Sequence, residues 1–308
     1  MLLLFAFVPQ FGAEGVWVSV FTAISAFCNA GFDLFGRFGD YSSLVPYVNN
    51  YYVQAVIMFM IMAGGLGFMV WVELAEYRKK RRLSLHAKVV LQFSVIFWVG
   101  GAVLLALLEW SNPRTMGGLS VPGKIMAALF QSVSTRTAGM NTIDLAACSP
   151  ISKLLMSVLQ FIGAAPGSTG GGVKVTTFAV LILTIRSVAQ GRDDCVIGGH
   201  HIESKTVYRA LTIIVIGAVA AFGSAVVVYY NTAETVSVID CIFESCSAFG
   251  TVGLSVGVTG QLNTGAKLLY MACMFMGRVG PVSLAISLTA KPDDNKRKVL
   301  PVGHINVG

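Results

Sequence analysis

Three stretches rich in Gly, Ser and Thr interrupt otherwise apolar sequence at regular distances along the chain. They cover residues 25–32, 132–140 and 247–254, and each contains one glycine that aligns with the others: Gly31, Gly139 and Gly253. Roughly 110 residues separate each glycine from the next, which indicates an internal repeat. In a membrane, non-helical backbone is tolerated only where protein buries it or where it lines a water-filled cavity. If the apolar segments cross a membrane, the repeated loops therefore point to a pore.

Composition places the chain in a membrane. Of its 308 residues, 55% are hydrophobic and 12% are charged, and the mean hydropathy is +0.72. This is typical of an integral protein with several spans. The net charge of +7 does not indicate nucleic-acid binding, because the basic residues form short runs between apolar segments, at 78–82, 186–192 and 291–298. Such runs mark the cytoplasmic side of a membrane.

Cysteines and histidines give no sign of a metal, a disulfide or catalysis. The six cysteines include no Cys-x-x-Cys pair and lie in or near apolar segments, so we interpret them as small buried hydrophobes. His200 and His201 fall in a polar stretch that we interpret as a solvated linker. An intramembrane enzyme would need a nucleophile with a base, or a metal cluster, within the spans, and we expect none.

Five apolar stretches are long enough to cross a hydrocarbon core, which takes about 20 helical residues. They lie near residues 50–76, 87–109, 153–186, 208–230 and 267–288. Shorter segments at 15–27, 123–134 and 236–248 precede the three loops and suit re-entrant helices. The predicted class is an all-α integral membrane protein with repeated units of span, re-entrant pore helix, filter loop and span. The units divide the chain at 1–80, 81–195 and 196–308.

The basic runs follow the second span of each unit, so each loop is expected to open to the outside. Asp33, Asp40, Glu109 and Asp144 fall on that side. Their carboxylates either raise the local concentration of cations or are ordinary solvated loop residues, and the sequence does not choose between the two.

The chain begins with only eight residues before Pro9, and eight helical residues reach about 12 Å. We therefore expect the first repeat to lack most of its leading span. The sequence does not favour a signal peptide, because the basic n-region and the cleavage site are missing.

The loops suit the transport of a bare cation. Extended backbone can offer carbonyl oxygens that replace the ion's hydration shell, and glycine permits the torsions that aim them inward. A re-entrant helix that ends at the pore adds partial negative charge. Thr251, Val252 and Gly253 match the first three residues of the filter loop of potassium channels.

A break interrupts the third predicted span. Proline and glycine abolish regular helix there, and the released peptide groups need partners or water. We interpret the segment as a gate, with a passive kink as the alternative. Its residues are Gly163, Pro166, Gly167, Ser168, Thr169, Gly170, Gly171, Gly172 and Lys174. A nucleotide-binding phosphate loop is rejected because Val173 separates Gly172 from Lys174.

Two arginines lie within apolar or loop sequence. Arg278 is deep in the last span, where burying a guanidinium costs on the order of 3 kcal/mol, so it is expected to act on the pathway. The alternative is a structural pair with a carboxylate such as Glu244. Arg136 is expected to point away from the axis, because pointing inward it would repel the ion.

At these residues the chain resembles the membrane subunit of the TrkH/KtrB/HKT superfamily of potassium transporters, and KtrB most of all. The resemblance covers nearly the whole chain. It rests on residues 25–32, 64–68, 81–86, 135–142, 165–174, 248–254 and 277–281.

The resemblance implies four covalently joined units around one pore, with a potassium filter of backbone carbonyls. On this chain the matching filter residues are Asn29, Ala30, Gly31, Thr137, Ala138, Gly139, Thr251, Val252 and Gly253. It also implies that residues 163–174 form an intramembrane gating loop, and that Arg278 faces it. Met140 stands where the family usually has Phe.

The same resemblance implies a homodimer in a bacterial inner (plasma) membrane. It implies a cytoplasmic KtrA/TrkA-type nucleotide-binding regulatory subunit, and sodium or protons as coupling ions. The first unit is expected to be absent, either because the sequence is truncated or because another chain supplies it. Two alternatives stay open: a secondary transporter of another solute, and a truncated fragment that conducts nothing.

Overall fold

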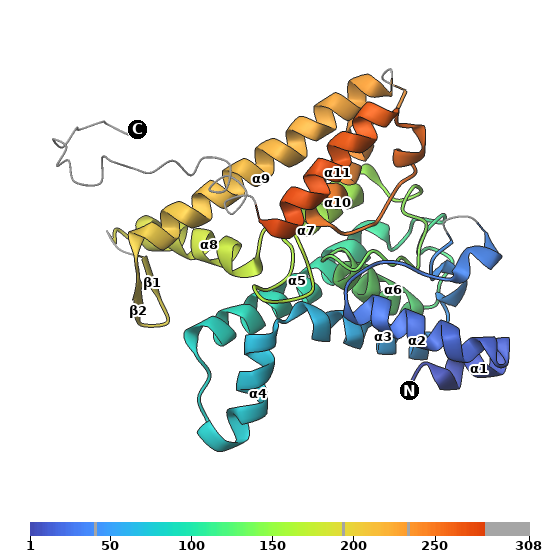
Figure 1. The fold of residues 1–308 in the computed structure, drawn as a ribbon, viewed down its shortest axis with the longest axis horizontal. Coiled ribbons are helices and arrows are strands. Elements are labelled where there is room, and N and C mark those ends of the chain that lie inside the picture. Colours follow the sequence, from blue (N-terminus) through green and yellow to red (C-terminus); the bar gives the residue numbers. More distant parts are fainter. Residues whose placement is uncertain (40–41, 193–194, 233–234, 281–308) are drawn as a thin grey trace.

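The computed structural model describes residues 1–280 apart from 40–41, 193–194 and 233–234, and these residues are mostly helical, as predicted (Figure 1). The elements in chain order are α1 (Leu4–Phe11), α2 (Glu14–Phe27), α3 (Tyr51–Gly65), α4 (Phe68–Lys80), α5 (Leu85–Glu109), α6 (Val121–Ser134), α7 (Pro150–Phe161), α8 (Val175–Ala189), β1 (Cys195–Ile197), β2 (His200–Ile202), α9 (Ser204–Asn231), α10 (Val238–Gly250) and α11 (Thr264–Val279). Short 3-10 turns occur at Phe35–Phe38, Val45–Tyr47 and Thr259–Gln261.

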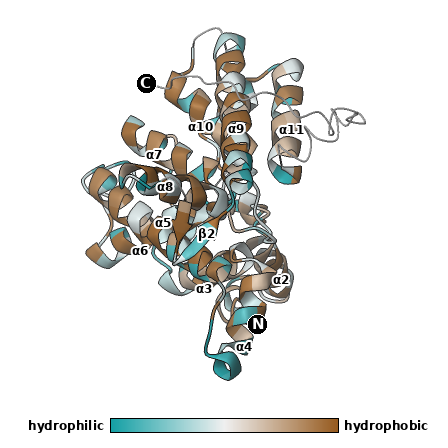
Figure 2. Cartoon of the chain, turned by 90° about the vertical axis from the view of Figure 1, so that its left-hand side faces the viewer, coloured by the Kyte–Doolittle hydropathy of each residue, from teal (hydrophilic) through white to brown (hydrophobic). Residues whose placement is uncertain are grey.

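Among the described residues, two helices are long and apolar enough to cross a membrane as single helices. They are α5, with a mean hydropathy of 2.2, and α9, with 2.6, and they correspond to the spans predicted at 87–109 and 208–230. Figure 2 shows hydrophobic residues along both helices. In Figure 1, α9 lies beside α11 along one side of the molecule, and the two helices are in contact.

The span predicted over residues 50–76 is not one continuous helix. It consists of α3 and α4, which are bent by 99° relative to each other. Between them Gly67 has φ 87°, a left-handed conformation that favours glycine. Because hydropathy stays high through the bend, the apolar pattern of the sequence does not reveal it. Beyond the bend, α4 projects from the rest of the molecule (Figure 1).

The break predicted in the third span is present. Helix α7 ends at Phe161 and α8 begins at Val175, and the segment between them is irregular apart from a parallel bridge between Ile162 and Val173. The last predicted span is described as α11, and its remainder, residues 281–288, lies outside the described residues together with the C-terminal basic run. At the start, α1 has eight residues and is too short to span, as expected.

The three short predicted helices are α2, α6 and α10, and each begins within two residues of its expected start. Ser120 and Ser237 cap α6 and α10, because their side chains accept hydrogen bonds from the backbone N–H groups of Gly123 and Ile239. Helix α2 packs against α1 and α3, α6 against α3 and α5, and α10 against α7, α9 and α11. Each short helix thus packs against at least two other helices, which fix where its C-terminal end points.

One small sheet was not predicted. Strands β1 and β2 form an antiparallel hairpin in which Val196 pairs with His201. His200 and His201 are exposed on this hairpin, so the expected solvated linker is in fact a folded turn. Of the cysteines, five are buried and Cys28 is exposed, which departs from the expected burial at that one position.

Candidate ion pathway

The three glycine loops, residues 29–31, 137–139 and 251–253, meet at one place in the molecule. A Cβ added to Gly139 would lie 2.2 Å from the carbonyl oxygen of Val252 and 3.1 Å from Cα of Gly31. A Cβ on Gly253 would come within 3.7 Å of Cα of Gly139. The three glycines are therefore direct neighbours in space, although about 110 residues separate each from the next in sequence. The contact is close enough that a side chain at Gly139 would collide with the neighbouring loop.

The three loops also share one backbone conformation. Gly31, Gly139 and Gly253 have φ angles of 76°, 79° and 92°. The residue two positions before each glycine is left-handed as well: Asn29 (φ 50°), Thr137 (φ 75°) and Thr251 (φ 52°). The residue between them is not left-handed, so the sign of φ alternates along each loop. Alternation of this kind turns successive peptide groups over and brings neighbouring carbonyl groups toward the same side of the backbone.

Each loop is held by the short helix that precedes it. The N–H groups of Ala30 and Val252 donate to the carbonyl oxygens of Ser25 and Ser247, both at 2.9 Å. The Ser25 hydroxyl donates to the carbonyl of Phe32 at 2.6 Å. In the second loop, Ser134 Oγ donates to the Met140 carbonyl and accepts from the Met140 N–H. Carbonyl and hydroxyl groups of serines near the C-terminal ends of the helices thus bind backbone groups of the loops that have no partner within a helix.

The second loop is the most enclosed of the three. Thr137, Ala138 and Gly139 are all buried, whereas Ala30 in the first loop and Gly253 in the third are exposed. Three side-chain oxygens at the ends of the loops next to the helices are buried without a hydrogen-bond partner: Asn29 Oδ1, Thr137 Oγ1 and Thr251 Oγ1. They occupy the same position in the three repeats.

The segment between α7 and α8, residues 163–174, packs against that same end of the glycine loops; we call it the central loop. A Cβ added to Gly170 would lie 2.3 Å from Thr137 Oγ1, and one added to Gly171 would lie 2.1 Å from Thr251 Oγ1. Asn29 Nδ2 donates to Thr169 Oγ1 at 2.9 Å. Three consecutive residues of the central loop therefore face the three glycine loops one by one.

Three cationic side chains hold the central loop through its carbonyl oxygens. Arg136 Nη2 donates to Gly163 at 2.9 Å, and Lys174 Nζ donates to Gly170 at 2.6 Å. Arg278 donates through Nη1 to the carbonyl of Thr169. Within the described residues, the three ion pairs that form involve none of these cations. Positive charge thus concentrates on the central loop.

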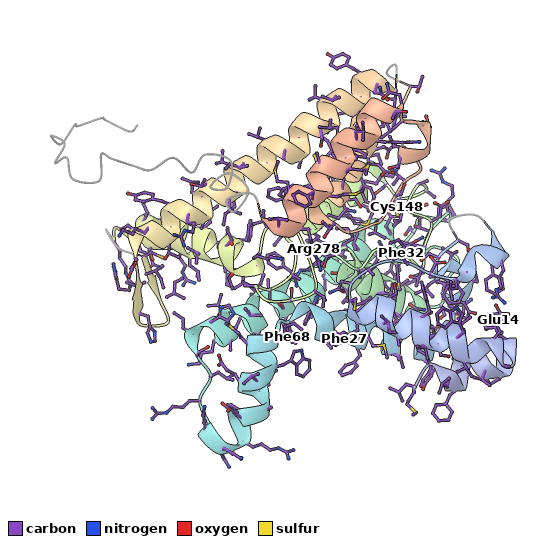
Figure 3. The ribbon with its side chains drawn as sticks, in the orientation of Figure 1. Glu14, Phe27, Phe32, Phe68, Cys148 and Arg278 are labelled. Carbon is purple, nitrogen blue, oxygen red and sulfur yellow. The ribbon has the colours of Figure 1, made fainter. Side chains whose placement is uncertain are left out.

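Backbone contacts tie the central loop to the helices around it. Phe68 N donates to the Gly167 carbonyl at 3.1 Å, and Ala165 N donates to the Gly65 carbonyl at 3.0 Å, so the bend between α3 and α4 fits against this loop. Figure 3 labels Phe27, Phe68 and Arg278, which come from three different elements around it. Gly172 N also donates to the carbonyl of Gly277 in α11 at 3.1 Å.

The structure answers the two questions about arginine. Arg136 points into the scaffold, where its guanidinium lies 5.4 Å from the ring centroid of Phe97 and 5.7 Å from that of Trp98. Arg278 contacts the central loop and not Glu244, so the alternative pairing with that carboxylate is wrong. Glu244 is buried and accepts instead from the N–H groups of Val256 (3.0 Å) and Val258 (3.2 Å) and from the hydroxyls of Ser255 and Thr259.

The acidic residues expected on the outer side bind the protein's own backbone. Asp33 accepts from Phe35 N and Asp144 accepts from Ala146 N, both at 2.9 Å. Glu109 is fully buried and accepts from Asn112, Thr115 and Ser149. The burial of Glu109 contradicts the alternative of an ordinary solvated loop residue at that position. For Asp33 and Asp144 both alternatives stay predictions. Asp40 lies outside the described residues.

Two features near the loops escaped sequence reasoning. Lys153 in α7 and Asp240 in α10 form an ion pair of 2.7 Å that is largely buried. Gly64 lies so close to α2 that an added Cβ would come 1.8 Å from the Phe27 carbonyl. A lysine within a predicted span was a usable signal for the first feature, because an intramembrane charge usually has a partner. For the close approach of Gly64 to α2, the only signal in the sequence was the glycine-rich run Gly64-Gly65-Leu66-Gly67.

Comparison with known proteins gives one consistent family. The profile of the family described as "TrkH: Cation transport protein" matches residues 4–298. The potassium/sodium uptake protein NtpJ of Enterococcus hirae is 36% identical over 288 residues, which are 92% of this chain and 62% of that protein. The Ktr system potassium uptake protein B of Bacillus subtilis is 34% identical over 302 residues, 98% of this chain and 66% of that protein.

The fold has a counterpart among solved structures. The crystal structure of the potassium transporter TrkH from Vibrio parahaemolyticus matches with a TM-score of 0.72 and 20% sequence identity. The match covers 93% of this chain and 62% of that one. The chain thus spans a little under two thirds of the length of the relatives that it matches.

Proposed function

This chain belongs to the TrkH family of membrane cation transport proteins, which are not enzymes, and from this premise we propose that it takes part in potassium uptake across the cell membrane. The ion passes between the three glycine loops, where backbone carbonyls of residues 29–31, 137–139 and 251–253 replace its hydration shell. The single observation that carries the proposal is the convergence of Gly31, Gly139 and Gly253 with one shared backbone conformation.

Potassium is the proposed ion because both relatives of about 35% identity are named for potassium uptake. Sodium is a second candidate, since the Enterococcus protein is named for both ions. A filter of main-chain oxygens suits either ion chemically, because carbonyl dipoles act as hard, neutral ligands. Sodium or protons as coupling ions remain part of the proposal.

The central loop is proposed as the gate, formed by Gly163, Pro166, Gly167, Ser168, Thr169, Gly170, Gly171, Gly172 and Lys174 with Arg278. Its support is position and charge. The loop covers the ends of all three glycine loops next to the helices, and Arg136, Lys174 and Arg278 hold it by its carbonyls. Positive charge on the pathway raises the barrier for a cation, so the loop has to move before ions pass.

The remaining assignments follow from the family. We propose that the short helices α2, α6 and α10 are pore helices of repeated units, divided at residues 80 and 195. A homodimer and a cytoplasmic nucleotide-binding regulatory subunit are proposed partners, because the relatives named as parts of a Ktr system imply a regulatory component. The location is the plasma membrane.

A second candidate is a chain that conducts nothing by itself. Its support is that the chain spans only 62% and 66% of the length of the two relatives described above. Flux of ⁸⁶Rb⁺ from liposomes that contain only this chain tests it. Flux at the level of empty liposomes supports the second candidate, and saturable flux excludes it.

The proposed function is tested by potassium uptake in cells that lack their own uptake systems, with the protein expressed from its complete reading frame. We expect Gly139→Ser and Gly253→Ser to lower uptake at least 10-fold, because a side chain in a left-handed filter position displaces carbonyls. Gly257→Ser is the matched control. Gly257 also has a positive φ (95°), but an added Cβ would meet nothing within 4 Å. Full uptake by both filter variants would refute the proposal.

A further inference from the structure

The central loop touches the three glycine loops unequally. Where it faces Thr137 and Thr251 it presents Gly170 and Gly171, which have no side chain to bond with. Where it faces the first loop it presents Thr169, whose hydroxyl binds Asn29. The described side-chain hydrogen bonds between the central loop and the glycine loops thus all involve Thr169 and the first loop. The same position carries threonine in the second and third repeats and asparagine in the first.

Every polar group of Thr169 is engaged. Its hydroxyl accepts from Asn29 Nδ2 at 2.9 Å and donates to the Phe27 carbonyl at 3.1 Å. Its N–H donates to the Gly64 carbonyl at 3.2 Å, and its carbonyl accepts from Arg278. Three separate segments, the end of α2, the end of α3 and α11, therefore meet at one residue of the central loop. Gly64 makes this possible, because an added Cβ there would lie 2.8 Å from Thr169 Oγ1.

Asn29 supplies a hydrogen-bond donor that reaches Thr169, which a threonine at this position could not. A hydroxyl offers one donor on a short stem, whereas the asparagine amide offers two donors and a longer reach. Asn29 is 5% exposed, and its Oδ1 has no partner, so the amide is fixed by its Nδ2 bond to Thr169. Thr137 Oγ1 and Thr251 Oγ1, the equivalent oxygens, make no hydrogen bond at all.

We propose that Asn29 is a positioning residue that fastens the central loop to the first glycine loop through Thr169 and thereby keeps the pathway closed. The inference rests on the proposed function of these loops. Opening breaks the Asn29–Thr169 and Thr169–Phe27 bonds, while the backbone of the filter keeps its conformation. The contact therefore sets how often the pathway opens and not which ion it selects.

The size of the effect follows from the bonds lost. A neutral hydrogen bond contributes about 1 kcal/mol, and a change of that size shifts a two-state equilibrium about 5-fold. Asn29→Thr removes the amide donor and restores the residue of the other repeats. Thr169→Val removes the hydroxyl at nearly constant volume. Asn29→Thr, which loses one bond, is expected to raise unregulated flux about 5-fold, and Thr169→Val, which loses two, about 25-fold.

The experiment measures ⁸⁶Rb⁺ flux into proteoliposomes that contain the transporter expressed from its complete reading frame, without its regulatory subunit. Asn29→Thr and Thr169→Val raise this basal flux, and the double variant raises it no further than Thr169→Val alone, since both remove the same contact. Thr169→Ser retains the hydroxyl and behaves as the unaltered protein. The ratio of Rb⁺ to Na⁺ flux stays unchanged in all of them.

Thr212→Val is the matched control, because it makes the same change in α9, outside the proposed gate and filter, where the hydroxyl donates to the Tyr208 carbonyl of the same helix at 2.8 Å. Unchanged or lower basal flux in Asn29→Thr and Thr169→Val overturns the inference, and so does an equal rise in Thr212→Val. If Asn29→Thr does not reach the membrane, the comparison of Thr169→Val with Thr169→Ser decides. If Gly139→Ser still abolishes uptake while these variants change nothing, the positioning role fails and the proposed function stands.

Discussion

The glycine loops and the central loop are both irregular backbone in apolar surroundings, yet they are supported in opposite ways. The glycine loops bond to the helix that immediately precedes them, through Ser25, Ser134 and Ser247. The central loop has one local bond, from Lys174 to Gly170, and is otherwise held by residues far away in sequence. Asn29 reaches it across 140 residues, and Arg278 across 109.

This difference has an energetic meaning. Local support forms together with the helix, so each glycine loop keeps its shape whatever its neighbours do. Long-range support consists of a few hydrogen bonds, each contributing about 0.5–3 kcal/mol, the larger values applying to charged donors. Removing one or two of them is enough to change the population of another arrangement. The proposed roles of the two regions, a rigid filter and a movable gate, require this contrast.

The largest expected effect concerns the convergence of the glycine loops. Gly139→Ala strains a left-handed position and also places a Cβ 2.2 Å from the Val252 carbonyl, whereas the nearest atom for Gly253→Ala is 3.7 Å away. Strain and overpacking each cost about 1–3 kcal/mol. Thermal unfolding in detergent should show Gly139→Ala destabilised by roughly 2–6 kcal/mol and Gly253→Ala by roughly 1–3 kcal/mol. Equal losses would contradict the packing of the second loop between the other two.

The next effect tests local support of the third loop. Glu244→Ala leaves the N–H groups of Val256 and Val258 without their acceptor and should cost about 3 kcal/mol of unfolding free energy. Glu244→Gln keeps one oxygen for these donors and should cost about 1 kcal/mol. Thermal unfolding separates the two variants, and Thr259→Val, which removes one bond to the carboxylate, is the control. A Glu244→Ala protein as stable as the unaltered one would show that local support is dispensable.

A smaller effect concerns the fit of the central loop. Gly171→Ala places a Cβ 2.1 Å from Thr251 Oγ1, which is the end of a side chain that can rotate or shift. We therefore expect the free energy of unfolding to fall by about 1–2 kcal/mol. Thr251→Ala removes the obstructing hydroxyl and should restore much of that loss in the double variant. Additive losses in thermal unfolding would mean that the two residues do not touch.

The contrast in support also explains what the sequence could predict. The glycine loops were found because their signals are local: small residues, a short apolar helix before each, and a repeat that compares one copy with the next. Positions 22 and 130 correspond to Glu244 in the other repeats and hold Thr and Phe, so no comparison of repeats pointed to that carboxylate.

The central loop was predicted as a break, but its partners were not. Proline and glycine indicate that a helix ends. They do not indicate which distant residues donate hydrogen bonds to the carbonyl oxygens that the helix leaves free. The bend at Gly67 was missed for a related reason, because it is fixed by contact between Phe68 N and Gly167 O and not by any loss of hydropathy. The sequence predicted the convergence of the three loops only by assuming that the repeats surround one axis. The coordinates were needed to test it.

The smallest expected effect concerns an exposed ion pair within the first repeat, and it depends on pH. Arg37, in the turn after the first glycine loop, donates to the carboxylate of Glu14 at the start of α2, and this contact closes the first repeat on itself. The hydrogen bond from Arg37, followed by its charge, lowers the pKa of Glu14 below the ordinary value of 4.5. A lowered carboxylate pKa means that the pair stabilises the fold above pH 4.5 and that this contribution is lost as pH falls through the depressed pKa.

Arg37→Met should therefore lower the melting temperature slightly at pH 7, and the difference from the unaltered protein should shrink as the medium is acidified below pH 4.5. Part of the difference should persist in acid, because the Arg37 guanidinium also lies 4.7 Å from the ring centroid of Phe11, and that contact does not titrate. Arg37→Lys, which keeps the charge without the forked geometry, is the control. Since the pair is exposed and belongs to one repeat, uptake at pH 7 should stay within about 2-fold of normal. A loss of uptake as large as that expected for Gly139→Ser would mean that surface contacts of the first repeat, and not its backbone, determine the position of Gly31.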